Sequence, residues 1–393
     1  MYLYEDPKWP HFYYDINCCL DLLNAIFLKY GLLLGKITSI KTEDLDLDKL
    51  HSNSLADEIV CSSQIEGEFL DRKTILESIN VRFSNSFNVP SSAQYEDGII
   101  AMMLDATQNY DKPLTCERLC AWQEKLFTRE YVDFYKIVVG AFRTDRFGPM
   151  LVSSQKHGQI KVHYQAPKAS DLPSMLSEFI TFINSHDNHS TYIKAAIAHL
   201  YFLTLHPFED GNGRISRAIC EYLLSKAEKS SKRLYSVSAQ IQKHKLEYYD
   251  IVEKTQKGDL NITKFVRWFL SMILNAIEAS LVMVDKAVEK SLFFQKIREV
   301  KLSKDQNKIV NMLLDGFEGK LTSKKFAKIA KTSQDTATRS LNYLIDHEIL
   351  VKEGAGPSTH YLLKSLGDTI VCDELVKAIE GVTTNGKTKL QQG

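Results

Sequence analysis

Apolar and polar residues follow a helical period along most of the first three hundred positions. Apolar residues recur three and four positions apart, the spacing that gives a helix one apolar face. The pattern predicts helices over about 16–34, 54–80, 93–110 and 115–128, and a further helical region from about 171 to 295. Gly67 interrupts the second of these helices, and the stretch 82–92, rich in Asn, Ser and Pro, is typical of a loop. We therefore expect a mainly α-helical protein.

One stretch in this region departs from the helical period. The sequence "GPMLVSSQKHGQIKVHY" alternates apolar and polar side chains on both sides of Gly158. Alternation of this kind is typical of a half-buried strand, and a central glycine favours a tight turn. Residues 149–164 are therefore predicted to form a β-hairpin.

From about residue 300 the pattern changes to two helices, a Thr-Ser turn, a third helix and two short strands around Gly354 and Gly356. This order predicts a winged helix-turn-helix domain. Between 300 and 365, eleven Lys and Arg residues stand against seven Asp and Glu residues, a mild positive excess that suits DNA. The candidate DNA contacts are Gln334, Thr338, Arg339 and Asn342 on the third helix and Lys352 in the wing. A winged helix that contacts only protein is the alternative, and the sequence leaves both open.

Length and charge limit the organisation of the chain. At 393 residues it is too long for one ordinary domain. We divide it into an N-terminal extension (1–92), a core (93–298), the winged helix (299–366) and a C-terminal helix with a disordered tail (367–393). Lys plus Arg and Asp plus Glu number 49 each, so no net charge draws the whole protein to nucleic acid or to an anionic membrane.

Cysteine usage and hydropathy favour a cytoplasmic protein. The seven cysteines are scattered and never spaced C-x-x-C, which argues against a disulfide framework or a zinc site. The N-terminus lacks the basic and apolar regions of a signal peptide. Polar residues such as Lys194 and Glu278 interrupt the two most apolar windows, 191–208 and 268–288, so we expect buried core helices and no membrane contact.

The stretch "LTLHPFEDGNGRISR", residues 203–217, gathers the residue types that nucleotide chemistry needs. Glycines before a helix let backbone N–H groups turn inward, and a helix N-terminus attracts phosphate. Arg214 and Arg217 are three positions apart, on one face of the first turn, where they could clamp a polyphosphate. Asp210 offers a hard oxygen for Mg²⁺, and His206 titrates in the range of a general base. A helix cap with surface arginines is the structural alternative, but the constellation is too dense for it.

This stretch matches every position of the motif H-P-F-x-[DE]-G-N-G-R-x-x-R, so the protein resembles a Fic-domain adenylyltransferase. The resemblance implies a Fic-type helical bundle with a β-hairpin flap, in which 93–298 is the catalytic core. ATP and Mg²⁺ are the implied substrate and cofactor. The implied roles are general base for His206, loop anchor for Phe208, Mg²⁺ ligand for Asp210, phosphate cradle for Gly211, Asn212 and Gly213, β-phosphate ligand for Arg214 and γ-phosphate ligand for Arg217.

Two further segments acquire roles through the same resemblance. The hairpin is similar to the flap that holds a target's side chain by strand pairing, a form of β-augmentation. Its residues expected to face the nucleotide or the target are Lys161, Val162, His163 and Tyr164. The segment "EYYDIVEKTQKGDL" (247–260) resembles the cover of adenine and ribose, with candidate contacts Tyr248, Tyr249 and Gln256. Simple packing is the alternative for the paired tyrosines.

The hexamer "SSQIEG" at 62–67 fits the inhibitory motif [ST]-x-x-x-E-[GN] of Fic proteins that carry their own inhibitor. Ser62 and Glu66 lie on one helix face, and Gly67 can end that helix. The resemblance implies that Glu66 pairs with Arg217 in place of the γ-phosphate, so the enzyme would be autoinhibited. The opening "YEDPKWPHFYYD" resembles the N-terminal extension of many bacterial members.

These observations predict an autoinhibited enzyme that transfers AMP from ATP to a Tyr, Thr or Ser hydroxyl of a protein, releasing pyrophosphate. The protein itself is one candidate target, and a homodimer is one candidate assembly. Two alternatives stay open: a nucleotide-sensing regulator that binds DNA, and an enzyme that removes AMP with the same site.

Overall fold

The computed structural model describes residues 2–39, 47–83, 94–127, 137–156, 159–185 and 189–364. The chain divides into two compact units, Met1–Val284 and Asp285–Gly393. The predicted C-terminal helix and tail (367–393) and most of the predicted loop at 82–92 lie outside the described residues.

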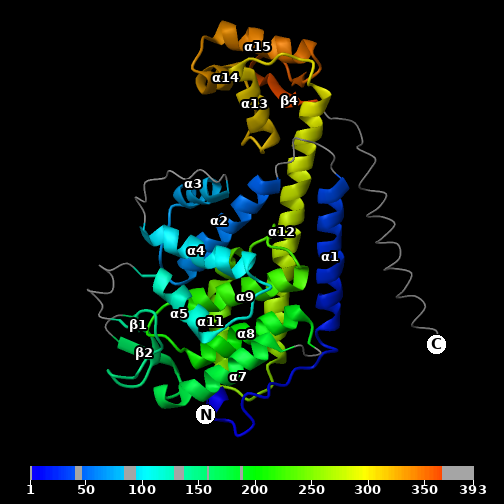
Figure 1. Cartoon of the computed structure of the whole chain (residues 1–393). Coiled ribbons are helices and arrows are strands. Elements are labelled where there is room, and N and C mark those ends of the chain that lie inside the picture. Colours follow the sequence, from blue (N-terminus) through cyan, green and yellow to red (C-terminus); the bar gives the residue numbers. More distant parts are fainter. Residues whose placement is uncertain are drawn as a thin grey trace, which may run out of the picture. The chain divides into compact units, whose positions relative to one another are not determined.

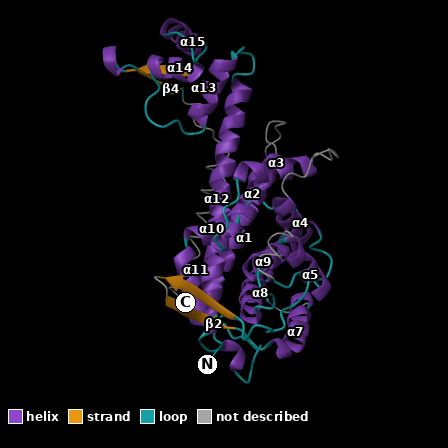
Figure 2. Ribbon diagram, turned by 90° about the vertical axis from the view of Figure 1, so that its left-hand side faces the viewer, coloured by secondary structure: helices purple, strands orange, loops and turns teal. Residues whose placement is uncertain are grey.

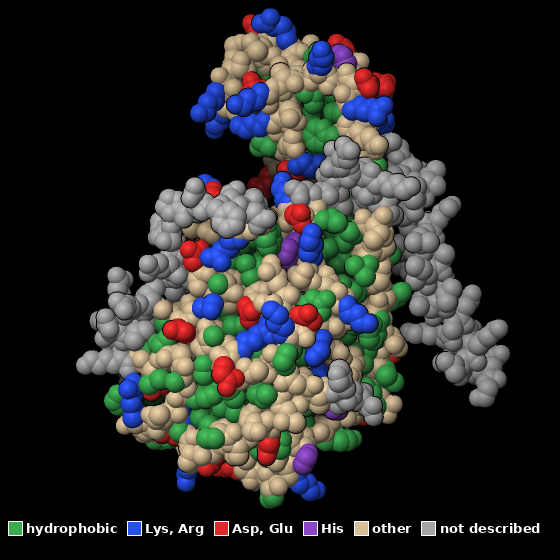
Figure 3. All heavy atoms as spheres, viewed as in Figure 1, with side chains coloured by type: hydrophobic (Ala, Val, Ile, Leu, Met, Phe, Trp, Pro, Cys, Tyr) green, Lys and Arg blue, Asp and Glu red, His purple; other side chains and the backbone are tan. Residues whose placement is uncertain are grey.

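Helices make up most of the first unit, which confirms the mainly helical prediction (Figure 1). They are α1 (Leu20–Ser39), α2 (Leu47–Ile65), α3 (Arg72–Phe83), α4 (Gln94–Gln108), α5 (Cys116–Lys125), α7 (Leu172–Asn184), α8 (Thr191–Leu205), α9 (Asn212–Glu228), α10 (Val237–Lys243), α11 (Lys245–Gln256) and α12 (Thr263–Lys296), which crosses the boundary between the units. Two 3-10 turns, Leu3–Glu5 and Ala169–Asp171, complete the helical elements of this unit. On the face seen in Figure 3, basic and acidic side chains are interspersed over it.

The first helix begins four residues later than the sequence predicts. The side chain of Asp15 accepts hydrogen bonds from the backbone N–H of Asn17 (3.0 Å) and the thiol of Cys18 (3.2 Å). Short polar side chains that bond to the backbone in this way favour turns over helices. The chain therefore turns before α1 starts at Leu20, and the helix runs on to Ser39 because Leu33 and Ile37 continue its buried face.

Helices α8 and α9 form the centre of the first unit (Figures 1 and 2). Every residue of α8 from Tyr192 to Leu205 is buried, as predicted for the window 191–208. The other apolar window lies in α12, the one helix of the described chain that is long and apolar enough to cross a membrane. In its most apolar window, 56% of the residues are buried inside the protein, which is also typical of a core helix.

The N-terminal aromatic segment packs on this helical centre. The N–H of Tyr13 donates to Leu260 O (2.8 Å), and the carbonyl of Tyr13 accepts from the N–H of Ile262 (2.9 Å). The rings of Trp9 and Phe12 meet the buried Tyr201 of α8 edge to face, at centroid distances of 4.9 and 5.4 Å. The first residues of the chain are thereby attached to the core.

The hairpin predicted at 149–164 is confirmed as strands β1 (Leu151–Lys156) and β2 (Gln159–Gln165), which pair antiparallel. The register shifts between Val152 and Ser153, where one strand carries an extra residue. The predicted turn at Gly158 lies outside the described residues.

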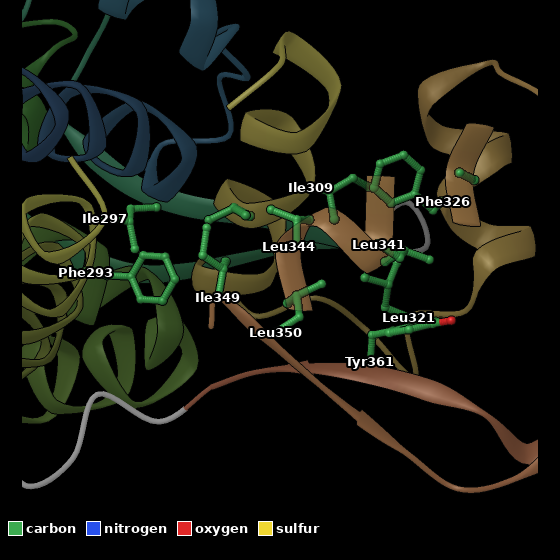
Figure 4. Close-up of a cluster of buried hydrophobic side chains, with 12 residues drawn as sticks. Phe293, Ile297, Ile309, Leu321, Phe326, Leu341, Leu344, Ile349, Leu350 and Tyr361 are labelled. Carbon is green, nitrogen blue, oxygen red and sulfur yellow. The ribbon is translucent and has the colours of Figure 1, made fainter. Parts of the chain in front are cut away.

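The second unit has its own apolar core (Figure 4). It contains α13 (Lys304–Leu314), α14 (Ser323–Ala330), α15 (Gln334–Asp346), β3 (Leu350–Glu353), a 3-10 turn (Gly356–Ser358) and β4 (His360–Leu363). Ser303, Thr322 and Ser333 cap the three helices through their hydroxyl oxygens. Leu341 and Leu344 of α15 and Phe326 of α14 are fully buried in this core.

The candidate DNA residues lie on the solvent side of α15. Arg339 and Asn342 are exposed, and Thr338 is half-buried, with its hydroxyl donating to Gln334 O at 2.8 Å. Lys352 on β3 is also exposed. The winged helix-turn-helix assignment and DNA binding stay predictions.

A buried carboxylate attaches α2 to the rest of the first unit. Glu58 accepts hydrogen bonds from the hydroxyls of Ser236 (2.7 Å) and Ser238 and from the N–H of Ser238 (2.9 Å), at the start of α10. A carboxylate can be buried when hydrogen-bond donors surround it in this way. Glu58 therefore fixes where α2 runs, and with it the segment that follows α2.

We expect Glu58→Ala to lower the free energy of unfolding by about 3 kcal/mol, because it leaves the donors of Ser236 and Ser238 buried without their acceptor. Urea unfolding followed by circular dichroism measures the loss. The control is Glu77→Ala on α3, where an exposed acid pairs with Lys73 one turn away and about 0.5 kcal/mol or less is expected. Equal losses in the two variants would contradict this role for Glu58.

Candidate active site

The candidate base lies at the C-terminal end of the central helix α8. His206 has a left-handed backbone (φ 46°, ψ 55°), and its N–H donates to Phe202 O at 2.9 Å. A left-handed residue ends a helix by turning the chain sharply. Non-glycine residues in this conformation carry strain and often occur at functional sites. The chain therefore leaves α8 at His206 and begins α9 six residues later.

Arg143 holds this turn from outside the motif. Its Nε donates to the carbonyl of His206 (2.8 Å) and its Nη2 to the carbonyl of Pro167 (2.5 Å), while Nη1 pairs with Asp145. The N–H of Arg143 donates to Pro207 O at 3.0 Å. Sequence analysis missed this residue, because a single arginine in an irregular segment has no pattern.

The loop after His206 is fixed from within by two reciprocal hydrogen bonds. The Asn212 side chain accepts from the N–H of Phe208 (3.0 Å) and donates to its carbonyl (2.8 Å). The Phe208 ring is fully buried against Phe142 and Phe202. Phe208 is thus the inward anchor that the sequence predicts, whereas Asn212 braces the loop.

Gly211 immediately precedes α9, with φ at 88°. Any other residue here would strain the backbone, and its Cβ would lie only 2.9 Å from Leu126 Cδ1. The adjacent Asp210 is partly exposed, and its Oδ1 accepts from the N–H of Gly211 at 2.6 Å. The geometry leaves Asp210 accessible at the start of α9.

The two motif arginines are buried in the first two turns of α9, with 3% of the Arg214 side chain and 2% of the Arg217 side chain exposed. Arg217 Nε donates to Ser62 Oγ, and its Nη2 donates to Ser62 O and to Glu66 Oε1, each at 2.8 Å. Arg214 Nη1 donates to Glu68 Oε2 at 2.7 Å. The predicted Glu66–Arg217 contact is present, and Glu68 adds a second ion pair that the sequence analysis did not predict.

A backbone motif at the end of α2 places both glutamates. The N–H of Glu68 donates to Ser63 O (3.0 Å) and that of Gly67 to Gln64 O (3.1 Å), with Gly67 left-handed at φ 88°. These two bonds define a Schellman motif, which favours glycine at this position. Gly67 therefore ends the helix as predicted and sets Glu66 and Glu68 on either side of the turn.

The carboxylate of Glu66 lies directly on the N-terminus of α9. A methyl group built at Gly213 would fall 2.0 Å from Glu66 Oε1. Because N–H groups at a helix N-terminus attract anions, this is a favourable place for a carboxylate. Glu66 thus occupies the space over the predicted phosphate cradle.

Burial sets the charge state of the histidine in this site. It lowers the pKa of His206 to about 4, with a further lowering by the nearby Arg143 charge. The imidazole is therefore neutral at pH 7 and can accept a proton. Burial opposes the charge of Arg217 as well, but the Glu66 carboxylate raises its pKa, so this guanidinium stays charged.

The four predicted flap residues point in different directions. Lys161 and Val162 are exposed on β2. His163 bonds to Ser154 Oγ through Nε2 (2.6 Å) and to Glu253 Oε2 through Nδ1 (2.7 Å), so it attaches the hairpin to α11 (Figure 2).

The prediction that Tyr164 faces the nucleotide or target is wrong. Its side chain is buried, packs on the rings of Tyr2 and Tyr4 and donates its hydroxyl to Thr204 O at 2.7 Å. Tyr164 pairs with Val152, and Val162 pairs with Ser153, so His163 is the extra residue of β2 where the register shifts. Such a bulge breaks the alternation of side chains, so Tyr164 is buried although Val162 is exposed. Tyr164 thus attaches the base of the hairpin to Thr204, which lies two residues before His206.

The three candidate adenine contacts differ in burial. Tyr248 and Gln256 are buried, and Tyr248 hydrogen-bonds His199 Nε2 at 2.8 Å. Burial lowers the pKa of His199 to about 3, so its ring is neutral and can accept this bond. Tyr249 is partly exposed, and its hydroxyl donates to Ile65 O at the end of α2. Tyr248 therefore has the packing role that was the alternative for the tyrosine pair. Tyr249 supports the segment that carries Glu66.

The residues present suit a magnesium nucleotide. The buried Arg217 Nη1 has no hydrogen-bond partner within the described ranges, so the site offers one more donor to an anion. No three His, Cys, Asp or Glu side chains gather into a metal site in those ranges. Mg²⁺ bound to a nucleotide needs one or two carboxylates besides the phosphates and water, and Asp210 is placed to supply one.

Comparisons with known proteins agree with this site. Residues 113–224 match the model of the Fic/DOC family, and residues 2–84 match a domain of unknown function (DUF4172). The chain is 34% identical over 104 residues to protein adenylyltransferase Fic of Aedes aegypti and 33% identical over 104 residues to that of Culex quinquefasciatus. These matches cover 26% of this chain and 19% of each relative, so the chain spans about a fifth of the length of the curated relatives it matches.

A solved structure extends the similarity of fold beyond the matched region. A Fic family protein from Desulfovibrio desulfuricans G20 aligns over 91% of this chain and 98% of that one, with a TM-score of 0.53 at 18% identity. The motif residues 206–217 fall inside the region that matches the family model. Residues 113–224 of the chain therefore form a Fic domain, similar in sequence to that of protein adenylyltransferases.

Proposed function

We propose that this protein transfers AMP from ATP to a Tyr, Thr or Ser hydroxyl of a protein and that Glu66 inhibits this transfer. The observation that carries the proposal is the pair of buried arginines at the N-terminus of α9, three positions apart and both neutralised by carboxylates of one segment. Buried guanidinium groups beside a helix N-terminus suit a polyphosphate.

The transfer would proceed by in-line attack on the α-phosphorus. His206, neutral at pH 7, takes the proton of the target hydroxyl as the new bond between oxygen and phosphorus forms. The bond between the α-phosphorus and the bridging oxygen breaks, and pyrophosphate leaves on Arg214 and Arg217. Mg²⁺ held by Asp210 would neutralise phosphate charge. The exposed edge of the hairpin would align the target by strand pairing.

Inhibition follows from competition for one guanidinium. Glu66 Oε1 lies 2.8 Å from Arg217 Nη2, where the γ-phosphate would bind. With Glu66 in place, ATP would bind with its α-phosphate out of line for attack. The Glu66 side chain is 34% exposed and Arg217 is buried, so the glutamate rather than the arginine is free to move.

Transfer of labelled AMP from ATP with Mg²⁺ tests the proposal. We expect weak self-labelling by the wild type and at least about tenfold more by Glu66→Gly, because Arg217 becomes available to phosphate. Glu66→Gly/His206→Ala should be unlabelled, because the base is lost. Labelling that persists in the double variant would refute the role of His206.

A second arm separates the alternatives. If none of the three proteins is labelled, AMP-modified protein is supplied and release of AMP is measured. Release that depends on His206 would favour AMP removal by the same site over AMP addition.

The pH dependence of the Glu66→Gly enzyme tests the state of His206. Because burial lowers the pKa of His206 to about 4, the neutral base persists as the pH falls and is lost only in strongly acid solution. We expect kcat/KM to be flat between about pH 8 and pH 6, and to fall about tenfold per pH unit only below about pH 4. Intrinsic fluorescence at each pH checks that the protein stays folded. An acid limb near pH 6.5, the ordinary value for histidine, would contradict the buried neutral base.

The second unit supports a second proposal, binding of duplex DNA. Arg339 and Asn342 are exposed on α15, where they can reach base edges or phosphates. We expect duplex binding that weakens with salt, and a loss of about tenfold for Arg339→Ala, measured by fluorescence anisotropy. Arg298→Ala, which removes an exposed arginine paired with Glu299 before α13, is the control. Equal effects of the two changes would indicate non-specific attraction, and absence of binding would favour a protein-contact role.

A further inference from the structure

The ion pair of Glu68 with Arg214 is separate from the contact that the inhibitory motif requires. Glu68 Oε2 lies 2.7 Å from Arg214 Nη1, whereas Glu66 holds Arg217. Each arginine thus bonds to its own glutamate, and Asp210 Oδ1 lies a further 3.7 Å from Arg214 Nη2. Under the proposed function, the two arginines serve different phosphates, with Arg214 on the β-phosphate and Arg217 on the γ-phosphate.

The backbone explains why both pairs form together. Glu66 and Glu68 flank Gly67 in a turn closed by two hydrogen bonds to the last turn of α2. On α9, Arg214 and Arg217 lie three positions apart, on one face. Lys245 Nζ (3.0 Å from Gln64 O) and the Tyr249 hydroxyl, which donates to Ile65 O, bind the carbonyls of the same turn. The two carboxylates are therefore presented by one fixed turn.

The surroundings of Arg214 restrict the movement of its side chain. The side chain is 3% exposed, and its guanidinium lies over the Phe127 ring at 5.3 Å from the ring centroid. Glu68 is 30% exposed. A phosphate that binds Nη1 of Arg214 takes the place of Glu68, whose side chain can turn into solvent while the arginine stays in place.

We propose that Glu68 lowers the affinity of the nucleotide site, because it competes with the β-phosphate for Arg214. This inference rests on the proposed function for the identity of the ligand. The two glutamates then affect ADP and ATP differently, because ADP has a β-phosphate for Arg214 but no γ-phosphate for Arg217. Glu68 weakens binding of ADP and ATP alike, whereas Glu66 acts mainly against ATP.

Nucleotide binding by the full chain tests this assignment without turnover. ADP and ATP, each with Mg²⁺, are titrated calorimetrically into His206→Ala and into the same protein with Glu68→Gln or Glu66→Gln added. Glu68→Gln should tighten ADP and ATP by a similar factor of about ten, because a neutral amide no longer competes with phosphate. Glu66→Gln should tighten ATP clearly more than ADP. The charge-matched control is Glu77→Gln on α3, which should change neither nucleotide by more than about twofold.

The outcomes separate this inference from the proposed function. If Glu68→Gln changes ADP and ATP binding no more than Glu77→Gln does, while thermal unfolding shows a folded protein, the competition is refuted. If it tightens ATP but not ADP, Glu68 opposes the γ-phosphate and its assignment to the β-phosphate is wrong. If nucleotides bind as expected but no AMP transfer occurs in the labelling assay, the role of Glu68 stands and the proposed reaction fails. If no variant binds either nucleotide, both are wrong.

Discussion

A guanidinium can be buried at low cost only beside an anion. Arg217 is buried near the start of α9, and the end of α2 supplies its hydrogen-bond acceptors: the carboxylate of Glu66 and two oxygens of Ser62. The arrangement of the first unit follows from this requirement. Helix α2 must end against α9, and Glu58 in turn holds α2 against the start of α10. The end of α2 and the candidate site are therefore parts of one packed structure.

The loop that begins at His206 is held by more hydrogen bonds within its own surroundings than by the two glutamates that cover it. Asn212 closes the loop on Phe208, and Arg143 holds the carbonyl of His206, so the loop keeps its shape through bonds of its own. Glu66 and Glu68 are about one-third exposed. Regulation that acts on this site would therefore move the glutamates and leave the loop unchanged, because the loop does not depend on them for its geometry.

The sequence predicted those parts of the fold and site that a local pattern encodes. Helical periodicity, the alternation in the hairpin and the dense motif at 206–217 all reflect neighbours along the chain. Arg143 and Glu68 were missed because their partners are distant in sequence and each is a single charged residue without a pattern. The orientation of Tyr164 was mistaken for a related reason: the motif identified the strand, but its buried face depends on what packs behind it, here Tyr2, Tyr4 and α8.

The contact between Glu66 and Gly213 has a consequence for how this protein can evolve. A methyl group at position 213 would fall 2.0 Å from Glu66 Oε1, so any side chain there expels the glutamate. The same side chain would also fill the space in which a phosphate must approach the helix N-terminus. A single substitution at position 213 would thus remove Glu66 from the site and also leave no room for the phosphate. Under the proposed function, a permanently active form would therefore arise by changes in Glu66 or in the turn that carries it, whereas position 213 must stay glycine.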